Sequence, residues 1–405
     1  MATKAHFSSA HTYPSTRGNG ATALAIELSE LQAHIRTLIT LEETEAPVLS
    51  CYVNRDLTDN GHGPILDHGA WTLRKTLRRE EREPFEQALE RITTFLGREL
   101  SSTTQGVAAF SRAGAHPYFL GLQFQVPVVD WLSIDSTPNI YHLVELKDTY
   151  HRYVVMISTA ESARILEVNL GAITRELWTE RPELRERVGR EWTREHYQAH
   201  RRDRGERFLR EKVAILDRLM SAGGHTHLIL AGTPEITARV RGKLPKHLAA
   251  KLIDMVPASS SARTVDVVGA TLSNFVAREQ QESLRAVMQL VSHLRRGGLA
   301  VVGTPSTLEA LERNQVDVLV MAKTYQPPRG LACKSCDRID TTTDRPTKCL
   351  RCGSTDLRPV NVKETIVKQA ERIGAEVEIV EHADVLMALG GVGCLLRYLT
   401  PEQAR

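Results

Sequence analysis

The sequence lacks any apolar run long enough to cross a bilayer as a helix. The longest candidate, residues 386–396, is interrupted by glycines, so it predicts a buried strand with its turn. The first residues also lack the apolar core of a secretory signal. We therefore expect a cytoplasmic protein without a membrane partner, in which cysteine thiols stay reduced.

The chain has little excess charge, with a formal net charge of only +3. Global charge therefore does not indicate a nucleic-acid-binding protein, and basic segments have to be judged locally. The phosphate-binding Walker A loop and the dinucleotide-binding glycine fingerprint are both absent. We expect no small-molecule substrate.

What is present indicates an α/β multidomain protein. A chain of 405 residues is too long for one ordinary core. We predict a flexible arm followed by three α/β domains, with these boundaries: 1–22 for the arm, 23–147 for the N-terminal domain, 148–272 for the middle domain and 273–405 for the C-terminal domain. The alternation of helical and strand patterns predicts a layered α/β/α arrangement for the C-terminal domain.

Local patterns place the main elements. In the first domain we expect a helix ended by Pro47, a strand at 48–54, a charged helix from about Ala70 to Leu100 and a hairpin of strands. The middle domain should contain two β-rich runs, a long charged segment at 179–210, a helix, a buried strand and a second helix starting at Pro234.

Four of the six cysteines form two C-x-x-C pairs within a predicted insert at 330–360. These residues are Cys333, Cys336, Cys349 and Cys352. Each tight turn presents two sulfurs, and two such turns can clamp one tetrahedral Zn²⁺. Because all four positions are cysteines, we expect one structural zinc per chain in a zinc ribbon. The remaining Cys51 and Cys394 lie in apolar strands and are expected to be core thiols.

The C-terminal domain resembles that of Pelota and the archaeal and eukaryotic class-one release factors. The resemblance rests on residues 298–322, on the insert and on the closing GGVGCLLRY at 390–398. The middle domain agrees through residues 208–240, including the Leu-Ala-Gly-Thr-Pro turn. Within this family, the bacterial branch that includes the ribosome hibernation factor Balon is the most similar.

Two motifs of the release factors are absent. The Gly-Gly-Gln tip, which hydrolyses peptidyl-tRNA in that family, does not occur, because the Gly-Gly pairs are followed by His225, Leu299 and Val392. The Asn-Ile-Lys-Ser codon reader is also missing. We therefore expect no enzymatic activity. His225 and His227 flank a strand start and are expected to be structural.

Arginines and aromatic residues alternate where the family tip should lie. Arginine neutralises phosphates and aromatic rings stack on unpaired bases, so this segment is a hypothetical rRNA contact. The candidate residues are Arg190, Trp192, Arg194, His196, Tyr197, Gln198, Arg201, Arg202 and Arg204. The alternative is a solvated amphipathic helix, since interspersed Glu and Asp residues balance much of the charge.

The resemblance implies a stress-related hibernation factor that occupies the ribosomal A site and protects the decoding and peptidyl-transferase centres. It also implies elongation factor Tu as a partner, because Pelota-type proteins act with a translational GTPase. One alternative is a rescue or release factor that uses another tip residue, such as Gln198. That residue lacks the two preceding glycines that give a flexible turn. A third interpretation is a binder of structured RNA unrelated to the ribosome.

Overall fold

The computed structural model describes residues 26–55, 63–114, 116–180, 194–259, 261–341 and 347–398. The predicted arm at 1–22 lies outside them. The chain forms two compact units. The middle unit consists of His151–Val276, with Met1–Glu27, and the composite unit joins Leu28–Tyr150 to Ala277–Arg405. The multidomain α/β prediction is confirmed, while the boundaries drawn from the sequence stay predictions.

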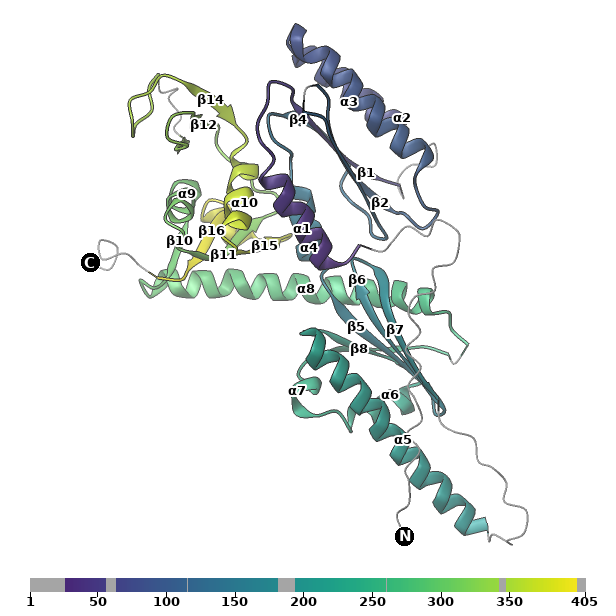
Figure 1. The fold of residues 1–405 in the computed structure, drawn as a ribbon. Helices are drawn as coiled ribbons and strands as arrows, with labels where there is room; N and C mark the ends of the chain where they lie inside the picture. Colours follow the sequence, from purple (N-terminus) through teal and green to yellow (C-terminus); the bar gives the residue numbers. More distant parts are fainter. Residues whose placement is uncertain are drawn as a thin grey trace, which may run out of the picture. The chain divides into compact units, whose positions relative to one another are not determined.

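The middle unit is built on one five-stranded sheet in the order β7-β6-β5-β8-β9 (Figure 1). The strand β5 is parallel to β8 and antiparallel to β6. The strands are β5 (Tyr153–Ser158), β6 (Ser162–Asn169), β7 (Ala172–Glu180), β8 (Leu228–Gly232) and β9 (Leu252–Pro257). The continuous apolar runs of β5 and β8 reflect burial on both faces.

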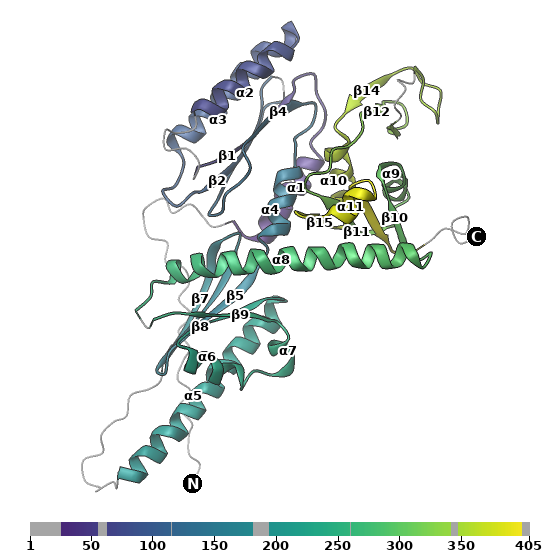
Figure 2. The ribbon, with the colours of Figure 1, turned by 180° about the vertical axis from the view of Figure 1, so that it is seen from behind.

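Helices cover both faces of this sheet. One face packs against α5 (Arg194–Gly223), α6 (Pro234–Arg241) and α7 (Lys246–Ala249), through residues such as Leu216 and Val240. The other face packs against the first half of α8 (Thr264–Arg295), where Phe275 stacks on Tyr153 with ring centroids 4.4 Å apart. Figure 2 shows α5 and α8 from behind. The unit is therefore three layers deep.

The composite unit begins with a four-stranded antiparallel sheet in the order β3-β2-β1-β4. Its strands are β1 (Val48–Asn54), β2 (Gly106–Arg112), β3 (Tyr118–Phe124) and β4 (Trp131–Asp135). Apolar residues of α2 (Gly63–Thr76) and α3 (Arg79–Arg98) bury one face. The helices α1 (Leu28–Ile39) and α4 (Tyr141–Thr149) contact each other and α10 (Val362–Arg372).

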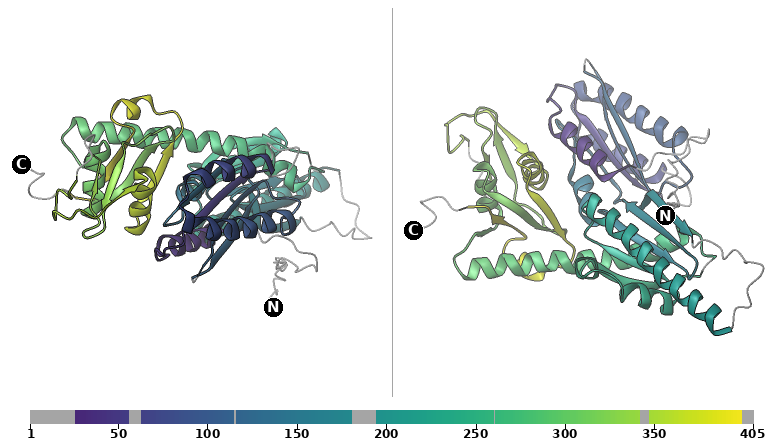
Figure 3. Two further views of the ribbon diagram at one scale, coloured as in Figure 1. Left: turned by 90° about the horizontal axis from the view of Figure 1, so that it is seen from above. Right: turned by 60° about the horizontal axis from the view of Figure 1, so that its bottom comes forward.

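The C-terminal part of the composite unit is a layered α/β/α structure. Its mixed sheet has the order β10-β16-β11-β15. Successive residues of β16 face opposite sides of this sheet. A Cβ at Gly393 would lie 2.9 Å from Leu290, so one side faces α8. Cys394 contacts Thr307, so the other side faces α9. Figure 3 shows α8 lying along one face of this sheet. The elements are β10 (Ala300–Val302), α9 (Thr304–Glu312), β11 (Val316–Ala322), β15 (Glu376–Val380), α11 (Asp384–Ala388) and β16 (Val392–Leu396).

Several details differ from the sequence predictions. The expected helix from Ala70 to Leu100 is two helices, α2 and α3, that meet at Leu77 and Arg78. The backbone N–H of Arg78 donates to the Glu81 carboxylate at 2.8 Å, which satisfies a donor at the start of α3. The strands β7 and β9 were not anticipated, and the segment assigned to 386–396 holds the end of α11 as well as β16.

Candidate functional site

The cysteine cluster lies in a small three-stranded sheet of the composite unit. Its strands are β12 (Gly330–Cys333), β13 (Ile339–Asp340) and β14 (Leu357–Val360), in the order β13-β12-β14. The ligand atoms of Cys333, Cys336, Cys349 and Cys352 all lie within 4.8 Å of one another. The structure therefore brings together all four sequence-predicted ligand positions.

The two C-x-x-C turns have the same backbone design. The N–H of Asp337 donates to the carbonyl of Cys333 at 2.9 Å, and the N–H of Gly353 donates to the carbonyl of Cys349 at 2.9 Å. Both donors follow the second cysteine of their turn and adopt positive φ, 55° for Asp337 and 74° for Gly353. The sequence indicated this conformation at Gly353 through its glycine, but Asp337 carried no comparable signal.

The sulfur positions fit a tetrahedral metal ion. The Sγ atoms of Cys333 and Cys352 lie 3.5 Å apart, and those of Cys336 and Cys349 lie 3.6 Å apart. Zinc–sulfur bonds of about 2.3 Å place tetrahedral sulfurs about 3.8 Å apart, close to these separations. Backbone N–H groups of Cys352 and Arg351 lower the pKa of the Cys349 thiol, whereas burial and the neighbouring sulfurs raise the pKa of Cys336 to about 12. The cluster can hold a metal ion.

The other two cysteines lie outside any such cluster. Cys51 in β1 and Cys394 in β16 are buried in the two four-stranded sheets of the composite unit. Burial raises the pKa of each thiol to about 12, so both are protonated near neutrality. Their expected role as core thiols agrees with this burial.

The second candidate site is the arginine-rich start of α5. Arg190 and Trp192 lie outside the described residues. The remaining candidates fall on the first turns of the helix, and these are Arg194, His196, Tyr197, Gln198, Arg201, Arg202 and Arg204. Among those whose side chains are described, Arg202 is exposed and Arg204 is half-buried.

Part of the charge on α5 is already paired within the middle unit. Glu206 accepts from Arg239 at 3.2 Å and lies 3.3 Å from the Lys243 ammonium. Hydrogen bonds from Lys243 and Arg239 lower the pKa of Glu206. Lys212 is buried and donates to the Ser158 hydroxyl at 3.0 Å and the Thr159 carbonyl at 2.7 Å. These contacts fix α5 to α6 and to the end of β5, as the alternative of an ordinary amphipathic helix requires.

A groove of about 730 Å³ lies beside these pairs, between the β5–β6 turn, α5 and α6. Its lining includes Thr159, Glu161, Arg202, Glu206, Lys212 and Arg239. Basic and acidic groups alternate around it, so the groove has no strong preference for an anion. Of the sequence candidates whose side chains the structure describes, Arg202 lines this groove and Arg204 does not.

The two histidines near β8 are buried. Burial, and then the nearby charges of Arg152, Lys251 and Arg175, lower the pKa of His225 to about 4. Its imidazole is therefore neutral near pH 7. Burial and neutrality of His225 fit the expected structural role.

Sequence comparison finds similarity to release factors over part of the chain. Residues 138–275, about a third of the chain, match the model of a family described as bacterial archaeo-eukaryotic release factor family 10. Peptide chain release factor subunit 1 of Pyrococcus abyssi is 29% identical over 133 residues, which cover 28% of this chain and 32% of that protein. The Thermococcus onnurineus protein is 30% identical over 139 residues, covering 30% and 34%. The match thus spans about a third of the length of these relatives.

Solved structures align with more of the chain, at low identity. An archaeal translation termination factor aligns with 93% of this chain and 99% of its own, at 16% identity and a TM-score of 0.26. Pelota of Archaeoglobus fulgidus aligns with 93% and 94%, at 12% identity and a TM-score of 0.36. Both scores are too low to add to the sequence matches. The sequence matches therefore show similarity to bacterial and archaeal release factors over about a third of the chain.

Proposed function

We propose that this protein is a ribosome-binding hibernation factor, similar to Balon, that occupies the A site without hydrolysing peptidyl-tRNA. The observation that carries the proposal is a middle unit of release-factor type in a chain without the Gly-Gly-Gln tip. Such a unit retains the means to enter the ribosome and lacks the residues that catalyse release in the family. The bound protein would shield the decoding and peptidyl-transferase centres of idle ribosomes.

The start of α5 supports the RNA-contact part of this proposal. Exposed Arg202 and the neighbouring helical candidates supply guanidinium groups that neutralise phosphates, with His196 and Tyr197 nearby in sequence for stacking. Because Glu206 is held by Arg239 and Lys243, its carboxylate does not neutralise the arginines that precede it. Exposed Arg202 therefore supports an RNA contact at the start of α5.

The cysteine cluster is proposed to hold one structural Zn²⁺. Cys333, Cys336, Cys349 and Cys352 would be its ligands, and the ion would supply folding free energy to the insert. With all four positions taken by protein sulfur, no site would remain for a substrate. Elongation factor Tu is the proposed GTPase partner, on the family resemblance alone.

The alternative is a rescue or release factor with a non-standard tip. Gln198 lies on the first turns of α5, in a regular helix. The release-factor glutamine follows two glycines, whose backbone freedom suits close approach to the ester bond. A helical glutamine lacks that freedom, which favours the non-hydrolytic proposal.

Binding to purified ribosomes provides the test. The protein should co-sediment with vacant bacterial ribosomes, and tRNA bound in the A site should displace it. Cryo-electron microscopy of the complex should then show density in the A site. Failure to bind ribosomes, combined with binding to other folded RNAs, would refute the proposal and favour a structured-RNA binder. Binding that A-site tRNA does not affect would also contradict it.

A further inference from the structure

Helix α4 of the composite unit begins without a cap from its own segment. The residue at the cap position is Ile140, whose side chain has no acceptor. The first N–H groups of a helix have no partner inside the helix and need an external acceptor when they are buried. Ile140 is fully buried and Tyr141 nearly so, so water cannot serve this purpose.

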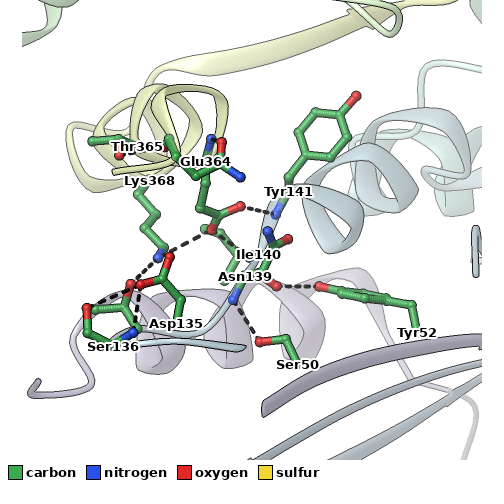
Figure 4. A network of polar contacts seen from close by, with 12 residues as sticks. Ser50, Tyr52, Asp135, Ser136, Asn139, Ile140, Tyr141, Glu364, Thr365 and Lys368 are labelled. Atoms are coloured by element: carbon green, nitrogen blue, oxygen red, sulfur yellow. Dashed lines mark hydrogen bonds and ion pairs between the residues drawn. The ribbon is translucent and has the colours of Figure 1, made fainter. Parts of the chain in front are cut away.

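The missing acceptor comes from α10. The Glu364 carboxylate accepts from the N–H of Ile140 at 2.6 Å and from the N–H of Tyr141 at 3.0 Å (Figure 4). Glu364 is only 4% exposed, so these charge-assisted bonds are shielded from solvent. A carboxylate at this end is also favoured by the helix dipole. Because the partners are more than 220 residues apart, the cap is a tertiary contact.

Further polar contacts surround this cap. Lys368 donates to the Thr137 hydroxyl at 2.6 Å and lies 3.4 Å from the Glu364 carboxylate. At the other end of α4, the Asp148 carboxylate accepts from the backbone N–H of Ile379 in β15 at 2.9 Å. Two more pairs join the same parts, Lys147 with Glu371 and Arg358 with Glu43. The contacts therefore hold both ends of α4.

The segment before α4 also forms hydrogen bonds with the N-terminal sheet. The N–H of Asn139 donates to the Ser50 hydroxyl at 2.9 Å, and the Tyr52 hydroxyl donates to the Asn139 carbonyl at 2.6 Å. Both partners lie on β1 (Figure 4). Residues 136–149 thus bond to the N-terminal sheet on one side and to α10 and β15 on the other.

We propose that α4 is an interlock that fixes the N-terminal part, Leu28–Tyr150, to the C-terminal part, Ala277–Arg405, as one rigid body. Glu364 controls the interlock because, among the described residues, it supplies the acceptor for both buried N–H groups at the start of α4. A change at this carboxylate leaves two buried donors without an acceptor, which is costly even though no apolar contact is lost. The two parts, which are remote in sequence, then move together. This inference does not depend on ribosome binding.

The first test is hydrogen exchange of the full chain carrying Glu364→Ala. Removing a charge-assisted bond to buried donors should speed exchange of the amides of residues 137–149 by roughly 10- to 100-fold. Exchange in β8 of the middle unit should stay unchanged. Glu364→Gln keeps one acceptor oxygen and should give a smaller increase. Glu376→Ala is the matched control, because Glu376 is exposed on the neighbouring strand β15.

The second test measures the distance between the two parts directly. Fluorophores attached through non-natural amino acids at exposed Glu90 of α3 and Arg285 of α8 should report a narrow distance distribution in the parent chain and in Glu376→Ala. Glu364→Ala, or Glu364→Gln if the alanine variant does not fold, should broaden it. An unchanged distribution in a folded Glu364 variant would overturn the proposal, as would unchanged exchange at residues 137–149.

Discussion

At the scale of single residues, the cysteine cluster leads to a direct prediction. Purified protein should contain about one zinc per chain, and Cys336→Ser should lose it, since a structural site requires its full set of thiolates. The melting temperature of the composite unit should fall as well. Elemental analysis and thermal unfolding measure both effects. Cys394→Ala is the control, because this buried thiol is not in the cluster. Unchanged zinc content in Cys336→Ser would contradict the assignment.

A second prediction at this scale concerns the buried carboxyl of Glu279 on α8. Burial, followed by repulsion from Glu282 and Glu378, raises the pKa of Glu279 to about 8. A raised carboxyl pKa means that the folded chain favours the protonated form. Stability from this group is therefore full below its ordinary pKa and is lost as the pH rises toward the folded value.

Replacing Glu279 by glutamine removes that pH dependence. Glu279→Gln should stabilise the chain by roughly 1–3 kcal/mol at about pH 8.5 and change little at about pH 5. Thermal unfolding at the two pH values gives the comparison. Glu376→Gln, at an exposed position, should have no such effect. Equal changes at both pH values would show that burial of a charge is not the cause.

At the scale of secondary-structure elements, variants of α5 can distinguish a helix that contacts RNA from one that faces solvent only. Arg202→Ala combined with Arg204→Ala should weaken ribosome binding, and each lost phosphate contact should lower the slope of log affinity against log salt by roughly one. The melting temperature should change little for exposed Arg202. Arg263→Ala, which removes an 82% exposed arginine elsewhere in the middle unit, is the control. An unchanged slope would mean that α5 faces solvent only.

The same scale shows which elements the sequence could predict. The strands β1, β5 and β8 are buried throughout and were predicted from their apolar runs. The strand β7 was missed because it lies at the sheet edge and carries exposed Arg175 and Glu176. The break between α2 and α3 carried two local signals, the capping Glu81 and Pro84 in the first turns of α3.

Whether a candidate site could be predicted depends on whether its contacts are local or distant in the sequence. The cysteine cluster was predictable because each ligand pair is set by a four-residue turn, and its closure is confirmed by the sulfur distances. The capping of α4 by Glu364 was not predictable, because it joins residues more than 220 positions apart and neither segment carries a spacing motif. For α5 the sequence indicated a charged segment. It could not show that Glu206 is paired within the middle unit whereas Arg202 is exposed.

At the scale of the whole molecule, the absence of the catalytic tip gives the last prediction. The protein should not release peptide from ribosomes programmed with a stop codon, because it has neither the Gly-Gly-Gln tip nor the Asn-Ile-Lys-Ser reader. A release assay with labelled peptidyl-tRNA on bacterial ribosomes measures this, with a bacterial class-one release factor as the positive control. The parent chain should instead inhibit release by that factor, since both would compete for the A site. Hydrolysis that depends on this protein and disappears in Gln198→Ala would establish the enzymatic alternative, whereas inhibition without hydrolysis is what an occupant of the A site must produce.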